Sequence, residues 1–215
     1  MNEELYELNS RIDFTLLDPR ATFSDVERLC DIAYKNKYRA VCVNPANVLL
    51  AKGYIAKNFF NELKVISVVG FPLGVSLTES KVDELKRVIQ DGADEIEFVL
   101  NIGKLKEGNF SFIKSEFSKL KKASKGRTLR CFIETCYLDE NEIIKISNLC
   151  SKQKIGIVTS TGFGTGGADE KSLSKILKEV AGTVDVKACG NIKTREDSVK
   201  FLNLGASTVG TSRVL

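Results

Sequence analysis

Histidine is absent from the 215-residue sequence, and its absence removes whole classes of catalytic site. A Ser-His-Asp triad and a histidine general base are excluded, because imidazole is the proton acceptor in those sites. A zinc site would have to be built from cysteine and carboxylate side chains alone. The six cysteines include no C-x-x-C pair, and most lie within apolar segments. They are therefore expected to be free, buried thiols.

Long hydrophobic runs and a secretory leader are also missing. Apolar runs such as Val65–Val69 and Ile96–Leu100 fall far short of the ~20 residues that span a bilayer. The first ten residues, MNEELYELNS, are acidic and polar, unlike the basic and then apolar start of a leader. The net charge is +4, and the densest basic run, Lys119–Lys125, suits a solvated helix face. We expect a cytoplasmic protein with no membrane or nucleic-acid partner.

Short apolar runs alternate with longer amphipathic stretches along the whole chain. The expected strands are Ile12–Leu16, Ala40–Val43, Val65–Val69, Glu95–Leu100, Leu129–Glu134, Ile155–Thr159, Val184–Ala188 and Thr208–Gly210. The expected helices are Ser24–Lys37, Pro45–Ala56, Thr78–Asp91, Phe110–Ser124, Asp139–Gln153, Glu170–Val180 and Arg195–Leu204. This order predicts a parallel α/β sheet, because parallel neighbours need a crossover that a helix supplies.

Two architectures fit that order, an open doubly wound sheet and a closed (β/α)8 barrel. Eight strands and a length near the lower end of the barrel range, roughly 200 residues, favour the parallel eight-stranded TIM barrel. No low-complexity linker divides residues 1–215, which are expected to form a single domain. In such a barrel, function lies at the carboxyl ends of the strands. Candidate residues at those ends include Thr15, Cys42, Thr159, Gly210 and Ser212.

Three loops after the last strands have the composition of a phosphate site. The stretch TSTGFGTGGA, Thr159–Ala168, offers hydroxyl and backbone donors before a helix N-terminus that favours an anion. Ala188–Thr194 and Gly210–Arg213 follow the seventh and eighth strands, where barrel phosphate sites are frequently built. The alternatives are a flexible glycine-rich connection and a solvated Lys193. The candidate ligands in these loops are Thr161, Gly162, Gly190, Asn191, Lys193, Gly210 and Ser212.

Lys187 lies in an apolar strand, where a lysine is costly unless it is paired or functional. A neutral amine there could attack a carbonyl, although the ordinary lysine pKa of about 10.4 is too high for this at neutral pH. The alternative is an ion pair with Glu97 or Glu134, two carboxylates in apolar strands. If those carboxylates point inward they are candidates for proton transfer; otherwise they pair with basic groups on helices. Arg130 shares a strand face with Glu134.

Taken in order, the motifs resemble the deoxyribose-phosphate aldolase family along nearly the whole chain. The matching pieces are IDFTLLDP (12–19), VCVNP (41–45), VVGFPLG (68–74), TESKV (78–82), GADEIEFVLNIG (92–103), FIETCYL (132–138), TSTGFGTGGA (159–168), VKACGNIKT (186–194) and GTSR (210–213). The resemblance implies a (β/α)8 barrel that reversibly cleaves 2-deoxyribose 5-phosphate to acetaldehyde and glyceraldehyde 3-phosphate. It implies a lysine Schiff base with no metal or cofactor, and a homodimer as one expected state.

The resemblance breaks at the residue that forms the Schiff base. In that family the lysine immediately precedes TSTG, and here this position is Val158, which cannot form an imine. Lys154 lies four residues back, about 13 Å away at roughly 3.3 Å per residue. The second lysine of the family falls on Lys187 and its relay aspartate falls on the longer Glu97. Arg130 stands where family members often carry a lysine.

Three functions are compatible with retained loops and a lost nucleophile. In the first, Lys187 forms the Schiff base from the neighbouring strand, Glu97 and Glu134 transfer protons, and the protein remains an aldolase. In the second, the protein is catalytically silent and binds a phosphosugar as a sensor or regulator. In the third, lysine and carboxylate groups perform acid/base chemistry without a covalent intermediate. A small phosphorylated sugar or aldehyde is the expected ligand in all three.

Overall fold

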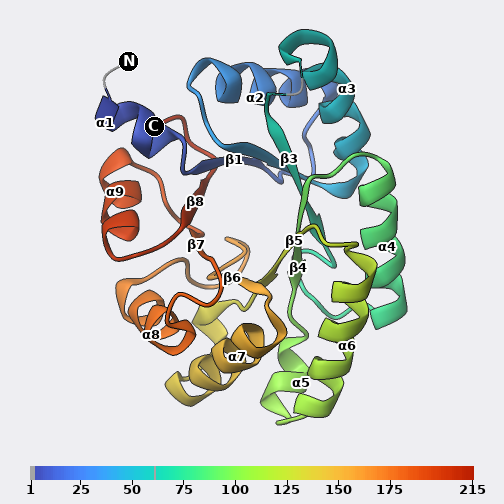
Figure 1. Ribbon diagram of the computed structural model, residues 1–215, viewed down its shortest axis with the longest axis vertical. Coiled ribbons are helices and arrows are strands. Elements are labelled where there is room, and N and C mark those ends of the chain that lie inside the picture. Colours follow the sequence, from blue (N-terminus) through green and yellow to red (C-terminus); the bar gives the residue numbers. More distant parts are fainter. Residues whose placement is uncertain (1–2, 61) are drawn as a thin grey trace.

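Eight parallel strands close into a barrel in the order in which they follow one another along the chain (Figure 1). The computed structural model describes residues 3–60 and 62–215. The strands are β1 (Ile12–Leu16), β2 (Ala40–Val43), β3 (Lys64–Val69), β4 (Glu95–Val99), β5 (Thr128–Phe132), β6 (Gly156–Val158), β7 (Val186–Cys189) and β8 (Thr208–Thr211). Because β1 pairs with both β2 and β8, the predicted (β/α)8 barrel is confirmed and the open sheet is excluded.

Helices surround the barrel and follow each of the first seven strands (Figure 1). They are α1 (Glu3–Asn9), α2 (Phe23–Lys35), α3 (Val48–Phe59), α4 (Thr78–Gln90), α5 (Ile102–Lys106), α6 (Phe110–Ala123), α7 (Glu140–Gln153), α8 (Glu170–Val180) and α9 (Arg195–Asn203). The sequence did not predict α1 and α5, which have seven and five residues, too few for apolar periodicity to show. The helix expected from Pro45 begins at Val48, after a 3-10 turn over Pro45–Asn47.

Buried side chains form two apolar layers on the two faces of the sheet. The larger one lies between the strands and the helices, and the smaller one fills the inside of the barrel. On β6, for example, Ile157 belongs to the outer layer and Val158 to the inner one, as alternation along a strand requires. The inner layer consists of Ala40, Cys42, Ile66, Val68, Val99, Phe132, Val158 and Cys189. All six cysteines are free and five are buried, as predicted.

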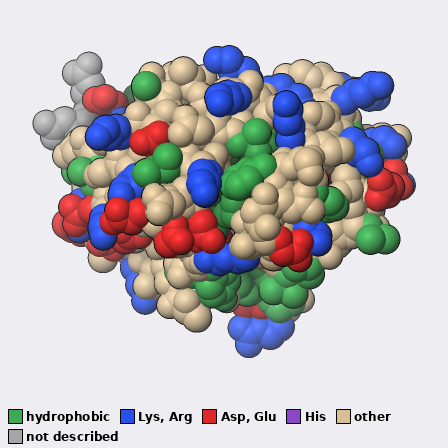
Figure 2. Space-filling view, turned by 90° about the horizontal axis from the view of Figure 1, so that it is seen from below, with side chains coloured by type: hydrophobic (Ala, Val, Ile, Leu, Met, Phe, Trp, Pro, Cys, Tyr) green, Lys and Arg blue, Asp and Glu red, His purple; other side chains and the backbone are tan. Residues whose placement is uncertain are grey.

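The surface is covered by mixed charges. Figure 2 shows acidic and basic side chains interspersed on one side of the molecule, with hydrophobic side chains gathered in its middle and at its lower edge. On α6, Lys119, Lys121 and Lys122 are exposed while Leu120 is buried, so the basic run is the solvated helix face that was predicted. In the part of the chain that the structure describes, no helix is long and apolar enough to cross a bilayer.

Candidate functional site

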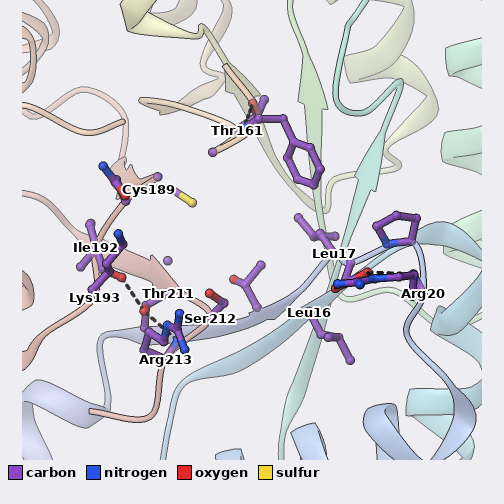
Figure 3. A pocket seen from close by; sticks show the side chains of 18 residues that line it. Leu16, Leu17, Arg20, Thr161, Cys189, Ile192, Lys193, Thr211, Ser212 and Arg213 are labelled. Carbon is purple, nitrogen blue, oxygen red and sulfur yellow. Dashed lines mark hydrogen bonds and ion pairs between the residues drawn. The ribbon is translucent and has the colours of Figure 1, made fainter. Parts of the chain in front are cut away.

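A cavity of about 630 Å³ opens at the carboxyl ends of β1, β6, β7 and β8 (Figure 3). We call it the mouth cavity. Eight of the ten predicted binding residues line it: Thr15, Thr161, Gly162, Gly190, Asn191, Lys193, Gly210 and Ser212. The structure thus brings together residues from four separate segments of the sequence. Its location agrees with the rule that barrel sites lie at the carboxyl ends of the strands.

The other two predicted binding residues, Cys42 and Thr159, lie behind the wall of the mouth cavity. Cys42 is buried in the inner layer. The Thr159 hydroxyl donates to the Cys189 carbonyl at 2.9 Å and accepts the Cys189 N–H at 3.0 Å. Because both of its hydrogen bonds join β6 to β7, Thr159 has no hydroxyl proton left for a ligand.

The loop after β7 packs tightly against the glycine-rich loop after β6. Gly190 has a φ of 95°, and its carbonyl accepts the N–H of Ala168 at 3.0 Å. A Cβ atom at position 190 would lie 3.0 Å from Cβ of Ser160 and 3.2 Å from Cα of Gly167. Both the conformation and the close approach therefore require glycine at this position. The two loops act as one wall of the mouth cavity.

Positive charge is concentrated on one side of the mouth cavity. Lys193 and Arg213 line it beside Ser212, across the cavity from Leu17 and Arg20 (Figure 3). Arg20 is paired with Asp18 at 2.8 Å, whereas neither Lys193 nor Arg213 takes part in an ion pair among residues 3–60 and 62–215. Two cations without a protein counter-charge match the charge of a phosphate monoester.

Glu134 holds the glycine-rich loop and does not contact Lys187. Its Oε2 accepts the N–H of Thr161 at 3.1 Å and the Thr161 hydroxyl in a shorter bond, and the Cys136 thiol lies 3.6 Å from Oε1. Glu134 has a left-handed backbone, with φ 53°, and this ends β5 at Phe132, two residues earlier than predicted. The carboxylate is buried and is aimed at the loop because of this turn.

Lys187 is buried deeper in the barrel than the mouth cavity and lies between two carboxylates. Its Nζ is 2.8 Å from Oε1 of Glu97 and 2.9 Å from Oδ2 of Asp13. The residue is 1% exposed and does not line the mouth cavity. The ion pair between Lys187 and Glu97, one of the two partners considered from the sequence, is therefore confirmed.

Two arginines complete a closed ring of alternating charges inside the barrel. Arg130 lies 3.6 Å from Glu97 and 2.7 Å from Glu95. Arg39 lies 2.7 Å from Glu95 and 2.6 Å from Asp13. This charge ring runs through Asp13, Lys187, Glu97, Arg130, Glu95 and Arg39. Its three cations balance its three anions, so the ring is neutral without a ligand.

The charge ring shifts the pKa values of Lys187 and Asp13. Burial by itself would lower the pKa of Lys187, but Asp13 and Glu97 outweigh burial and raise that pKa above the usual lysine value. Burial would raise the pKa of Asp13, but Lys187 and Arg39 lower it. At neutral pH Lys187 is therefore an ammonium ion, with no free electron pair to attack a carbonyl.

Position 158, where the resemblance places the reactive amine, carries a fully buried valine. Val158 is in register with Phe132 of β5 and with Lys187 of β7. Leu17 and Cys189 both line the mouth cavity. Cys189 belongs to the inner layer, and Leu17 packs against that layer. We call Leu17 and Cys189 the apolar floor, because both line the mouth cavity and lie in or against the inner layer.

Residues 9–169 match the model of the DeoC/LacD family aldolases. The chain belongs to this family. A deoxyribose-phosphate aldolase of Thermococcus gammatolerans is 44% identical over 204 residues, which cover 94% of this chain and 90% of that protein. A deoxyribose-phosphate aldolase of Treponema denticola is 39% identical over 209 residues, which cover 96% of this chain and 95% of that protein. The deoxyribose-phosphate aldolase structure from Aeropyrum pernix is 30% identical with a TM-score of 0.88, over 96% and 87% of the two chains.

This protein is therefore deoxyribose-phosphate aldolase-like in sequence and fold, as its motifs implied. Sequence analysis missed half of the charge ring, namely Asp13, Arg39 and Glu95. The signal was available in part, because Asp13 and Glu95 stand in apolar strands. Arg39 directly precedes β2, where a charged residue is ordinary, and only the closed barrel brings it to Asp13 and Glu95.

Proposed function

We propose that this protein binds 2-deoxyribose 5-phosphate or a closely related phosphosugar in the mouth cavity without forming the imine of its family. The observation that carries this proposal is the position of Lys187, which is buried with its Nζ paired to both Glu97 and Asp13 in the charge ring. Val158 supplies no amine in its place. Binding without turnover suits a sensor or regulator of phosphosugar levels.

The side of the mouth cavity that carries Lys193 and Arg213 supports phosphate binding. Lys193 and Arg213 provide two positive charges, and Ser212 lies near them on the same side of the cavity (Figure 3). Gly190 and Gly210 line the same cavity with backbone atoms alone. A dianionic phosphate on this side would direct the sugar toward the apolar floor.

Aldol cleavage through Lys187 is the second candidate function, and the short distance to Glu97 favours it. The ammonium group would pass a proton to the carboxylate 2.8 Å away, and the resulting amine would add to the substrate carbonyl. Loss of water from that adduct would give the imine. This route leaves Glu97 neutral and Lys187 without charge, and the substrate must reach a side chain that is 1% exposed.

Calorimetric titration with 2-deoxyribose 5-phosphate tests the proposal, together with an assay for released acetaldehyde. We expect saturable binding with no acetaldehyde. The double variant K193A/R213A should bind at least about tenfold more weakly, because it removes both phosphate-side cations. The double variant K171A/K200A removes two exposed lysines of α8 and α9 and should bind like the parent protein. Acetaldehyde formation, or no binding at millimolar ligand, contradicts the proposal.

The location and the assembly of the protein stay predictions from the sequence. We infer a cytoplasmic protein that forms a homodimer, and the relative from Aeropyrum pernix is described as tetrameric. Sedimentation of the purified chain measures the assembly directly. A monomer at micromolar concentration would contradict the homodimer.

A further inference from the structure

We propose that the mouth cavity also binds phosphate monoesters that carry a planar, apolar ring, with the ring lying against Phe163. This inference rests on the proposed phosphate site, since it adds a second binding element to the same cavity. It concerns the part of the cavity wall that Phe163 forms, on the glycine-rich loop after β6.

Three phenylalanine rings form a continuous aromatic column from the inner layer to the rim of the mouth cavity. Phe132 belongs to the inner layer, where it is in register with Val158. Its ring centroid lies 5.6 Å from that of Phe71, which lies 5.3 Å from that of Phe163 in an edge-to-face arrangement. Phe163 lines the mouth cavity and is 54% exposed. The rim therefore presents an aromatic face that Phe71 supports from behind.

The hydroxyl groups near this wall already donate within the protein. The Thr15 hydroxyl donates to the Asp13 carbonyl at 3.1 Å. The Thr161 hydroxyl donates to Glu134 and accepts the N–H of Phe163 at 3.1 Å. A ring that lies against Phe163 therefore finds no free hydroxyl proton on these two residues, and a planar apolar ring needs none.

The floor of the mouth cavity is also suited to a ring. Leu17 is apolar, and burial raises the pKa of the Cys189 thiol to about 11, so this group stays neutral. Valine at position 158 extends the apolar surface beneath the floor, where an ammonium group would have made it polar. With about 630 Å³, the cavity lies within the size range of small-molecule sites and has room for a ring beside a phosphate group.

The test compares phosphate esters of equal charge by calorimetric titration: phenyl phosphate, methyl phosphate and 2-deoxyribose 5-phosphate, with inorganic phosphate as reference. Phenyl phosphate should bind at least about tenfold more tightly than methyl phosphate. The variant F163A should reduce this preference to about threefold or less while leaving methyl phosphate affinity unchanged. F23A is the matched control, because Phe23 is 56% exposed on α2 and does not line the mouth cavity.

The outcomes separate this inference from the proposed phosphate site. A phenyl preference that F163A abolishes and F23A preserves supports the ring site. Equal binding of phenyl and methyl phosphate overturns the ring site and leaves the phosphate site intact. A phenyl preference that survives in F163A overturns the placement of the ring against Phe163. If none of the four anions binds, the proposed function fails and this inference fails with it.

Discussion

Glu97 and Lys187 form a buried ion pair across the inside of the barrel, with 2.8 Å between Oε1 and Nζ. The pair joins β4 to β7 and is part of a neutral ring of six charges. Val158 lies beside Lys187 in register and carries no charge. The barrel thus surrounds a position that cannot form an imine with a closed charge ring and with the cationic side of the mouth cavity.

Replacement of Val158 by lysine should create an amine in the inner layer. Burial and the neighbouring ammonium of Lys187 both lower the pKa of such an amine, which favours its nucleophilic form. We expect V158K to release acetaldehyde from 2-deoxyribose 5-phosphate at least about 10²-fold faster than the parent protein. V158M is the control, because methionine has similar length and no amine. A folded but inert V158K would show that the site has diverged beyond one missing group.

Glu97→Gln should destabilise the barrel strongly. The substitution removes one anion from the charge ring and leaves Lys187 and Arg130 with fewer counter-charges, which typically costs about 3–5 kcal/mol for a buried pair. Denaturation by urea measures this loss. The control is Asp83→Asn, which breaks the exposed Lys86–Asp83 pair on α4 and should cost less than about 1 kcal/mol. Equal losses in the two variants would contradict a stabilising role for the ring.

Stability should have a plateau around neutral pH and fall on both sides. The folded pKa of Asp13 and that of Glu95 are lowered, so their stabilisation is present above their unfolded pKa values, about 3.9 and 4.3, and is lost as pH falls further. The folded pKa of Lys187 is raised, so its stabilisation is present below its unfolded pKa of about 10.4 and is lost as pH rises above it. Urea midpoints measured from pH 3 to pH 11 check this profile. Unchanged midpoints at both extremes would contradict it.

Glu134 should position the glycine-rich loop for binding. Glu134→Ala removes the acceptor of both Thr161 hydrogen bonds, and we expect binding of 2-deoxyribose 5-phosphate to weaken about tenfold. Glu134→Gln keeps an acceptor oxygen and should bind within about threefold of the parent protein. Glu140→Ala, on the outer face of α7, is the control and should leave affinity unchanged. If E134A binds as tightly as the parent, the loop does not depend on Glu134.

The fold could be predicted from the sequence because apolar runs and amphipathic stretches alternate without interruption. The bounds of β1 and β2 agree with the prediction to the residue. The late strands agree less well, since β6 spans just Gly156–Val158 and β7 begins at Val186. The predicted strands also took in Ile155 and Val184, which are apolar but lie outside β6 and β7, so composition alone cannot show where the extended backbone begins.

The residues that line the mouth cavity could be predicted from the sequence more fully than the members of the charge ring. Glycines and hydroxyls at strand ends mark the mouth cavity locally, residue by residue. Partners in the charge ring are set by barrel closure, as when Arg39 before β2 meets Glu95 of β4. The orientation of Glu134 depends on its left-handed backbone, which its residue type does not suggest.

Borohydride reduction of the protein in the presence of 2-deoxyribose 5-phosphate, followed by intact and peptide mass spectrometry, tests most directly whether Lys187 is held as an ammonium ion. Reduction traps any imine, so the result does not depend on turnover. The account predicts no adduct at ligand concentrations that saturate binding, and a trapped adduct at position 158 in V158K as the positive control. A stoichiometric adduct at Lys187 in the parent protein would contradict the account and establish aldolase chemistry from β7.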